Sequence, residues 1–167
     1  ITVTPNIRAA IVTVSDKGFS GERADKSGPA LVEALKGKAL IGTTMIIPDE
    51  IERIKSILVE LCDSGDYDLV LTTGGTGFAP RDVTPEATLA VIDRLTPGIP
   101  EAMRQASMQI TPRAMLSRAI AGIRKSTLIL NLPGSPKAAV ESIQVFLPVI
   151  AHAVETLRGE TFECGRK

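Results

Sequence analysis

The feature that most constrains the fold of this chain is the alternation of short apolar runs with longer stretches of helical period. Four runs rich in aliphatic and β-branched residues indicate buried strands, at residues 8–14, 40–47, 68–73 and 126–132. The segments that indicate helices lie between and after them, at 27–37, 51–65, 85–94, 98–110 and 135–159. Strands that alternate with helices form βαβ units. We therefore predict an α/β fold, a three-layer αβα sandwich with a mostly parallel, doubly wound sheet.

The ends of several predicted helices carry recognisable capping residues. Ser27 is a candidate N-cap and Gly37 a candidate C-cap of the same helix. Thr84 is followed by a proline and an acidic residue, which is typical of a helix start. The segment 113–124 has no clear period and fits either a short strand or a turn.

Length and hydrophobic content indicate one compact domain. The chain has 167 residues, of which 44% are hydrophobic, and a domain usually takes roughly 100–200 residues. No internal repeat or linker interrupts the pattern. We expect residues 1–167 to form a single domain with its core at about 7–160 and a short polar tail after Glu160.

Composition excludes several classes of function. The 19 basic and 19 acidic residues balance, whereas binding to nucleic acid or to an anionic membrane needs a basic excess. Aromatic residues are only 3% of the chain, too few for a base-stacking surface. No apolar run reaches the roughly 18 residues of a membrane span, and no signal-peptide pattern is present. We expect a soluble cytoplasmic protein that binds neither nucleic acid nor membrane. The balanced charge is compatible with a small phosphorylated ligand, which needs only a local cluster of donors.

The few cysteine and histidine residues argue against zinc and against a protein nucleophile. The two cysteines, Cys62 and Cys164, are far apart in sequence, and His152 is the single histidine. Cys62 fits a core position, and Cys164 lies in the polar tail. His152 lies among apolar residues of the last predicted helix, where we expect a half-buried structural histidine. No Ser-His-Asp or Cys-His arrangement follows.

Polar and glycine-rich loops follow all four predicted strands. Ligands of open parallel sheets bind outside the carboxyl ends of the strands. If the strands are parallel, these loops meet at one edge of the sheet. The loops are Ser15–Gly18, Pro48–Glu50, Gly74–Gly77 continuing to Asp82, and Asn131–Lys137.

Two of these loops suit a phosphate. The glycine-rich loop consists of Gly74, Gly75, Thr76 and Gly77. Its glycines let backbone N–H groups approach an anion, although the same residues also suit a tight turn, and the lysine of a Walker A loop is missing. The other loop offers Gly134, Ser135 and Lys137 at a helix start, where an anion is stabilised. Ordinary capping by Ser135 and a solvated Lys137 is the alternative.

Two aspartates beside these loops are candidate magnesium ligands. Carboxylates next to a phosphate site repel the phosphate unless a cation lies between them, and Mg²⁺ takes oxygen ligands and phosphates together. Asp49 and Asp82 occupy such positions, although Asp49 also suits the N-cap of the next helix. Asp16 fits either this cluster or a turn. Arg81 and Lys17 are candidate charge-neutralising residues, or solvated surface residues.

Several motifs together resemble one known family. They are Val14–Asp16, Asp25–Gly28, Ile47–Glu50, Thr72–Gly77, Arg81–Thr88, Leu116–Arg118 and Asn131–Lys137. In this combination they resemble the molybdopterin-binding family, which includes the MogA and MoaB proteins and the G domain of gephyrin. The resemblance covers about residues 7–160 and is strongest toward MogA.

The resemblance implies a molybdopterin adenylyltransferase of molybdenum cofactor biosynthesis. In that family the terminal phosphate of molybdopterin attacks the α-phosphate of Mg-ATP, giving adenylylated molybdopterin and pyrophosphate. The family is usually a homotrimer and passes its product to a molybdate-inserting, MoeA-like enzyme. Its two essential aspartates correspond to Asp49 and Asp82. Ser15 joins the two loops as a candidate phosphate ligand.

One departure leaves a second interpretation open. Some MogA enzymes carry an insertion after the Leu-Pro-Gly loop, whereas here Ser135 and Lys137 run straight into the last predicted helix. This compact form also resembles MoaB-like members, some of which are not adenylyltransferases. The alternative is therefore a non-catalytic molybdopterin-binding or carrier protein. A scaffold and a nucleotide-binding switch or kinase are disfavoured by the missing second domain and the missing Walker lysine.

Overall fold

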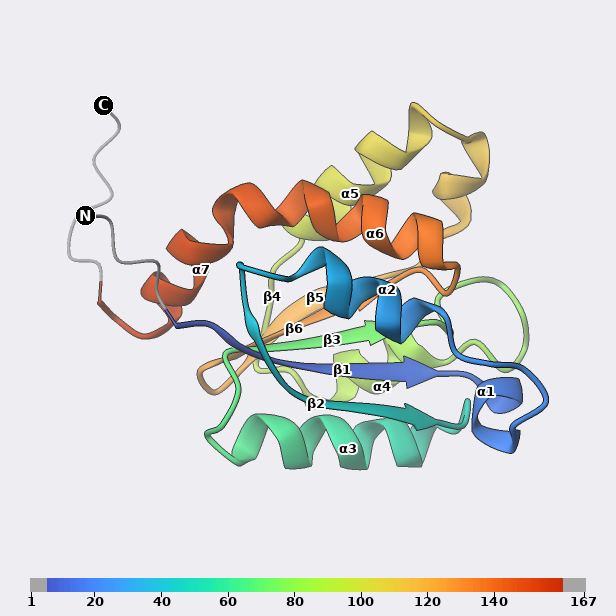
Figure 1. Ribbon diagram of the computed structural model, residues 1–167, viewed down its shortest axis with the longest axis horizontal. Helices are drawn as coiled ribbons and strands as arrows, with labels where there is room; N and C mark the ends of the chain where they lie inside the picture. Colours follow the sequence, from blue (N-terminus) through green and yellow to red (C-terminus); the bar gives the residue numbers. More distant parts are fainter. Residues whose placement is uncertain (1–5, 161–167) are drawn as a thin grey trace.

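One six-stranded sheet forms the centre of the protein. The computed structural model describes residues 6–160, and the strand order in its sheet is β2-β1-β3-β6-β5-β4 (Figure 1). The strands are β1 (Arg8–Val14), β2 (Leu40–Ile47), β3 (Leu69–Thr73), β4 (Arg94–Leu95), β5 (Ala121–Arg124) and β6 (Thr127–Leu132). The polar tail and Cys164 lie outside the described residues.

The sheet is mostly parallel, as predicted. Strands β2, β1, β3 and β6 are paired in parallel, and they are the four strands that the apolar runs indicated. The strand β5 pairs with β6 in antiparallel orientation and lies within the segment 113–124 that the sequence left open. The short strand β4 was missed because both its residues, Arg94 and Leu95, are exposed and carry no apolar pattern.

Helices cover both faces of the sheet (Figure 1). They are α1 (Asp16–Ser20), α2 (Ser27–Ala34), α3 (Ile51–Asp63), α4 (Thr84–Val91), α5 (Gly98–Met108), α6 (Pro136–Phe146) and α7 (Ile150–Leu157), with 3₁₀ turns η1 (Pro112–Leu116) and η2 (Leu147–Val149). Helices α2, α5, α6 and α7 lie on one face, and α3 and α4 on the other (Figure 1). The three-layer prediction is confirmed.

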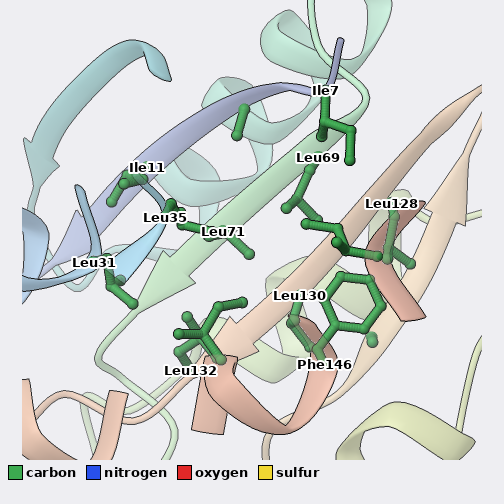
Figure 2. Close-up of a cluster of buried hydrophobic side chains, with 14 of the residues drawn as sticks. Ile7, Ile11, Leu31, Leu35, Leu69, Leu71, Leu128, Leu130, Leu132 and Phe146 are labelled. Carbon is green, nitrogen blue, oxygen red and sulfur yellow. The ribbon is translucent and has the colours of Figure 1, made fainter. Parts of the chain in front are cut away.

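Alternation along the strands divides the core into two layers. Ile11 of β1 packs with the α2–α6 side of the sheet, and the next residue, Val12, packs with the α3–α4 side. Successive side chains of a strand point to opposite faces, so a strand that is apolar throughout requires cover on both sides. Figure 2 shows the first of these layers, where Phe146 of α6 lies beside Leu130 of β6.

The last predicted helix is interrupted. A single helix was expected over 135–159, but Pro148 lies in the 3₁₀ turn η2 between α6 and α7. Proline has no N–H to donate within a helix. The stretch Pro136–Leu157 is long and apolar enough to cross a membrane by length and composition. Its buried residues, Ile143 and Phe146 among them, pack on the sheet, which makes it a core element of a globular fold rather than an indication of a membrane protein.

Three predicted helix caps were wrong, because Ser27 and Thr84 are the first residues inside their helices and α2 ends before Gly37. Ser27 is the first residue of α2, and the Oδ1 atom of Asp25 accepts the N–H of Ser27 at 3.1 Å and that of Gly28 at 3.2 Å. Thr84 is the first residue of α4, and its hydroxyl donates to the carbonyl oxygen of Gly74 at 3.0 Å. Gly37 lies beyond Leu35, the actual C-cap of α2.

Candidate active site

The order of the strands opens a cleft between the carboxyl ends of β1 and β3. The chain leaves β1 for β2 on one face of the sheet and returns to β3 on the other, which is the topological switch point where ligands of such sheets bind. The cleft there measures about 830 Å³. Its lining includes most of the predicted site: Ser15, Asp49, Gly74, Gly75, Asp82, Gly134 and Ser135.

Two glycines let β3 turn sharply into the cleft. Gly74 and Gly75 have φ angles of +103° and +68°, a region that L side chains rarely adopt. A Cβ atom on Gly74 would lie 2.3 Å from the carbonyl oxygen of Val14. A Cβ atom on Gly75 would lie 2.3 Å from Thr84 Oγ1 and 3.2 Å from Asp49 Oδ1. Glycine is therefore required at both positions by conformation and by space.

The glycine-rich loop presents a row of backbone donors. The N–H of Gly74 is engaged, because it donates to the carbonyl oxygen of Leu132 at 3.1 Å. The N–H groups of Gly75, Thr76 and Gly77 donate to no acceptor among residues 6–160. Three successive N–H groups of this kind form an anion-binding backbone. The predicted phosphate loop thus has donors at Gly75–Gly77 but not at Gly74.

The second predicted loop lies directly against the first. A Cβ atom on Gly134 would lie 3.3 Å from the Cα atom of Gly74, so the two backbones touch. The Ser27 hydroxyl donates to the carbonyl oxygen of Gly134, and the Thr73 hydroxyl to that of Pro133, each at 2.6 Å. These bonds join the second loop to the start of α2 and to the end of β3.

Three predicted phosphate ligands have structural roles as well or lie farther out. Ser15 caps α1, accepting the N–H of Gly18 at 3.0 Å, and Ser135 caps α6, accepting the N–H of Ala138 at 3.2 Å. The side chain of Lys137 is 85% exposed, lies 4.0 Å from Glu141 and is not part of the cleft lining. The capping alternative for Ser135 is therefore confirmed.

Asp49 does not cap α3. Glu50 occupies the N-cap position and forms no side-chain cap bond. The Asp49 side chain turns toward the loop after β1, where its Oδ2 atom accepts the N–H of Asp16 at 2.8 Å. The Oδ1 atom of Asp16 in return accepts the N–H of Asp49 at 3.0 Å. This reciprocal pair joins the carboxyl ends of β1 and β2 and places Asp16 in the cluster.

Charges around Asp49 set the ionisation of the cluster. Arg81 binds the Asp16 carboxylate through two nitrogens, at 2.6 and 3.0 Å, and this contact lowers the pKa of Asp16. Burial, together with the charges of Asp16 and Asp82, raises the pKa of Asp49 above its usual 3.8. Arg81 thus pairs with Asp16, and the negative charge of Asp49, next to the row of backbone donors, has no cation paired with it among residues 6–160.

Asp82 is held inside the loop that follows the glycines. Its Oδ2 atom accepts the N–H of Ala79 at 3.0 Å, and a Cβ atom on Gly77 would lie 2.9 Å from the same oxygen. The Oδ1 atoms of Asp49 and Asp82 accept no hydrogen bond from residues 6–160. Within that range no three acidic, histidine or cysteine residues form a metal cluster. Two carboxylates with one unengaged oxygen each still fit Mg²⁺, which commonly takes one or two carboxylates plus phosphates of the substrate.

Two supporting residues were not identified as such from the sequence. Arg118 contacts the glycine-rich loop and the Asp82 segment through several hydrogen bonds. Asn131 at the end of β6 donates to Thr72 and Thr88, both at 3.0 Å, within the buried interior. The sequence signals that could have found them are the place of Asn131 at the end of an apolar strand and the place of Arg118 in the family motif Leu116–Arg118.

A second, mostly apolar cavity of about 270 Å³ adjoins the loops, and Thr76, Gly77 and Pro133 contribute to its lining. The glycine-rich loop therefore passes from the main cleft to this cavity. His152 contributes to neither space and lies on the exposed face of α7. The expected half-buried position of His152 was wrong. Cys62 is buried in the core as predicted, and burial raises the pKa of its thiol to about 12.

Comparison with known proteins identifies the family of this chain. The family model described as probable molybdopterin binding domain matches residues 10–152. A molybdopterin adenylyltransferase of Escherichia coli K12 is 50% identical over 141 residues, which are 83% of this chain and 72% of that protein. Gephyrin of Dictyostelium discoideum is 46% identical over 155 residues, 86% of this chain, but the match spans only 21% of gephyrin.

Solved structures agree as well. The molybdopterin biosynthesis enzyme MoaB of Thermus thermophilus has a TM-score of 0.88 at 49% identity, covering 94% of this chain and 99% of that one. A MogA structure has a TM-score of 0.84 at 34% identity, covering 90% and 99%. Because the family model covers most of the chain and several relatives are matched over most of their length, this chain belongs to the molybdopterin binding domain family.

Proposed function

We propose that this protein is a molybdopterin adenylyltransferase of molybdenum cofactor biosynthesis. The observation that carries the proposal is one cleft with two half-buried carboxylates, Asp49 and Asp82, beside the unengaged N–H groups of Gly75–Gly77. Carboxylates next to a loop of anion-binding donors suit a phosphate ligand that arrives with a cation. The relatives named adenylyltransferase support the same activity.

In the proposed reaction an oxygen of the terminal phosphate of molybdopterin attacks the α-phosphorus of ATP. A new P–O bond forms, and the bond to pyrophosphate breaks. Phosphoryl-type transfer takes little covalent chemistry from a protein and depends on alignment and charge neutralisation. Bound Mg²⁺ supplies charge neutralisation at the phosphates, and the unengaged Oδ1 atoms of Asp49 and Asp82 are the atoms that would hold it.

The loops supply the remaining interactions in this proposal. The N–H groups of Gly75–Gly77 hold phosphate oxygens, and the α1 start at Ser15 contributes to the same site. We assign Gly134, Ser135 and Lys137 to the phosphate of the pterin, with Lys137 reaching in from its exposed position. The adjoining apolar cavity offers a less polar surface next to these phosphate groups.

Binding without turnover is the second candidate function. Its support is the compact connection from the Leu-Pro-Gly loop into the next helix, where Ser135 leads directly into α6. A connection of this compact form, without an insertion after the loop, also resembles that of MoaB-like members. In that case Asp49 and Asp82 would not support transfer, and changing Asp82 would leave pterin binding largely intact.

Pyrophosphate release separates the two functions. The purified protein is incubated with ATP, Mg²⁺ and molybdopterin, and a control omits the pterin. Pterin-dependent release with an adenylylated product supports the transferase, whereas pterin binding without release supports the carrier.

The Asp82→Asn variant tests the role of its carboxylate. We expect loss of transfer with pterin binding nearly retained, because the change removes a charge and little volume. Asp66→Asn is the matched control, since Asp66 is exposed in the turn after α3. Turnover of Asp82→Asn at the wild-type rate would refute the assignment.

Several broader expectations belong to the same proposal. We propose that the chain acts as a single molybdopterin-binding domain in the cytoplasm and assembles as a homotrimer. We also propose that the adenylylated product passes to a molybdate-inserting, MoeA-like enzyme. Light scattering across the micromolar range checks the trimer, and a monomer throughout that range would contradict it.

A further inference from the structure

Arg118 joins both ends of the loop that carries Asp82. Its backbone N–H donates to the carbonyl oxygen of Thr76 at 2.9 Å, and its Nε atom donates to that of Gly77 at 2.8 Å. Its Nη2 atom donates to the carbonyl oxygen of Asp82 at 2.6 Å. The remaining Nη1 atom pairs with the carboxylate of Glu86 at the start of α4. One side chain therefore bridges residues on both sides of the loop tip.

The loop itself has few other restraints. One pair of hydrogen bonds joins Ala79 and Asp82, at 2.9 and 3.0 Å. Arg81 also binds Asp16 through two nitrogens and so joins the loop to the end of β1, although both side chains are exposed to solvent. Phe78 at the tip is 68% exposed and so buries little surface that would fix the loop. The position of Asp82 relative to the cleft thus depends on what holds the backbone on either side of the tip, since a segment with few buried contacts opens easily.

Arg118 is itself held in place from the opposite side. Arg104 of α5 donates through its Nη1 atom to the carbonyl oxygens of Ser117, at 3.2 Å, and Ala119, at 2.9 Å. These are the residues directly before and after Arg118. The helix α5 packs on α6 and the sheet, so the backbone that carries Arg118 is anchored to the body of the domain.

We propose that Arg118 is a positioning residue of the adenylyl-transfer site, which holds the Asp82 carboxylate and the Gly75–Gly77 donors in one fixed arrangement. The inference rests on the proposed function, because its kinetic test measures adenylyl transfer. Arg118 acts through the backbone and touches no reacting atom.

The chemistry of the side chain explains why arginine is required. A planar guanidinium has five N–H donors in a fixed fork, and three of its nitrogens are used here for Gly77, Asp82 and Glu86. Lysine carries the same charge at one point and cannot span these acceptors. The variant Glu86→Gln tests the two kinds of contact separately, because it removes the charge of the Glu86 pair and leaves the bonds from Arg118 to the carbonyl oxygens of Gly77 and Asp82 in place.

The experiment compares Arg118→Lys and Arg118→Ala with the wild type in the pyrophosphate assay, with Mg²⁺ varied. We expect kcat to fall about 10- to 100-fold in both variants, because a misplacement of about 1 Å costs this order of rate. The Mg²⁺ concentration for half-maximal rate should rise, while KM for molybdopterin changes less than about threefold, since a positioning residue acts on alignment more than on binding. Glu86→Gln should keep kcat close to that of the wild type.

A matched control is available at the far end of β5. Arg124 binds Asp63 through two nitrogens and the carbonyl oxygen of Val91 through a third, as Arg118 does in its own place. Arg124→Ala removes a comparable network remote from the cleft. It should lower stability without changing the Mg²⁺ dependence of the rate, which separates positioning from general destabilisation.

Amide hydrogen exchange provides a readout that does not depend on activity. In Arg118→Ala the N–H groups of Ala79 and Asp82 should exchange at least about tenfold faster, while those of the central strand β6 stay protected. Unchanged exchange at both amides would overturn the proposal, as would a wild-type Mg²⁺ dependence and kcat in Arg118→Lys. If the wild type releases no pyrophosphate, the proposed function fails, and the exchange result alone decides whether Arg118 holds Asp82.

Discussion

Replacing Gly75 by alanine tests the architecture of the cleft directly. At φ +68° an alanine adopts a left-handed conformation, which costs about 1–2 kcal/mol. Its Cβ atom would also lie 2.3 Å from Thr84 Oγ1, so the threonine must turn away. That movement breaks the buried hydrogen bond from Thr84 to the carbonyl oxygen of Gly74, a loss of about 1–3 kcal/mol. We expect the free energy of unfolding to fall by about 2–5 kcal/mol.

The assay is urea denaturation at neutral pH, with Gly37→Ala as the matched control. Gly37 has φ +75°, and a Cβ atom there would meet nothing within 4 Å. The control carries the conformational cost alone, so it should lose about 1 kcal/mol, part of the cost being offset in the unfolded chain. Equal losses in the two variants would refute the crowding at Thr84, and with it the close packing of Gly75 against Asp49.

Two further predictions concern charge. Burial and the neighbouring carboxylates raise the pKa of Asp49, so its ionised form weakens the fold at pH values above 3.8. Asp49→Asn should therefore abolish transfer, yet unfold at a higher urea concentration than the wild type at pH 7. The difference in urea midpoint between the two proteins should close below about pH 4. Burial alone would raise the pKa of Asp68, but hydrogen bonds from Arg158 and Arg8 lower it, so this carboxylate stabilises the fold above its unfolded pKa and the stability is lost as pH falls through its lowered value. Arg158→Ala should therefore cost about 2 kcal/mol at pH 7 and progressively less below about pH 3.8, as followed by urea denaturation across that range; a cost independent of pH would contradict the role of this pair.

The main layers of the fold could be predicted because the sequence expresses them locally. The strands β1, β2, β3 and β6 are runs of apolar residues that need cover on both faces. The glycine-rich loop after β3 and the acidic residues after β2 and β3 follow from strand direction alone, since parallel strands end at one edge. The match of Arg81–Thr88 to a known family added the chemistry expected at that edge.

Local patterns failed where a residue's partner is distant in sequence. Serine is a common N-cap residue, yet the hydroxyl of Ser27 donates to the carbonyl oxygen of Gly134, 107 residues away. Asp49 precedes a helix, yet its carboxylate accepts the N–H of Asp16, which follows a different strand. The edge strand β4 carries no apolar signal, because its two residues are exposed and only backbone pairing with β5 makes it a strand.

The sequence by itself determined that this chain forms a layered α/β domain with glycine-rich loops and two acidic residues at one edge of the sheet. Those features depend on hydrophobic period, on glycine positions and on chain direction, which are properties of neighbouring residues. Only the tertiary structure decided which backbone donors and which carboxylate oxygens remain without a hydrogen bond, and that Arg118 contacts both sides of the Asp82 loop. A hydrogen bond between residues 36 or 41 positions apart depends on how packed elements meet, and no local pattern encodes that meeting.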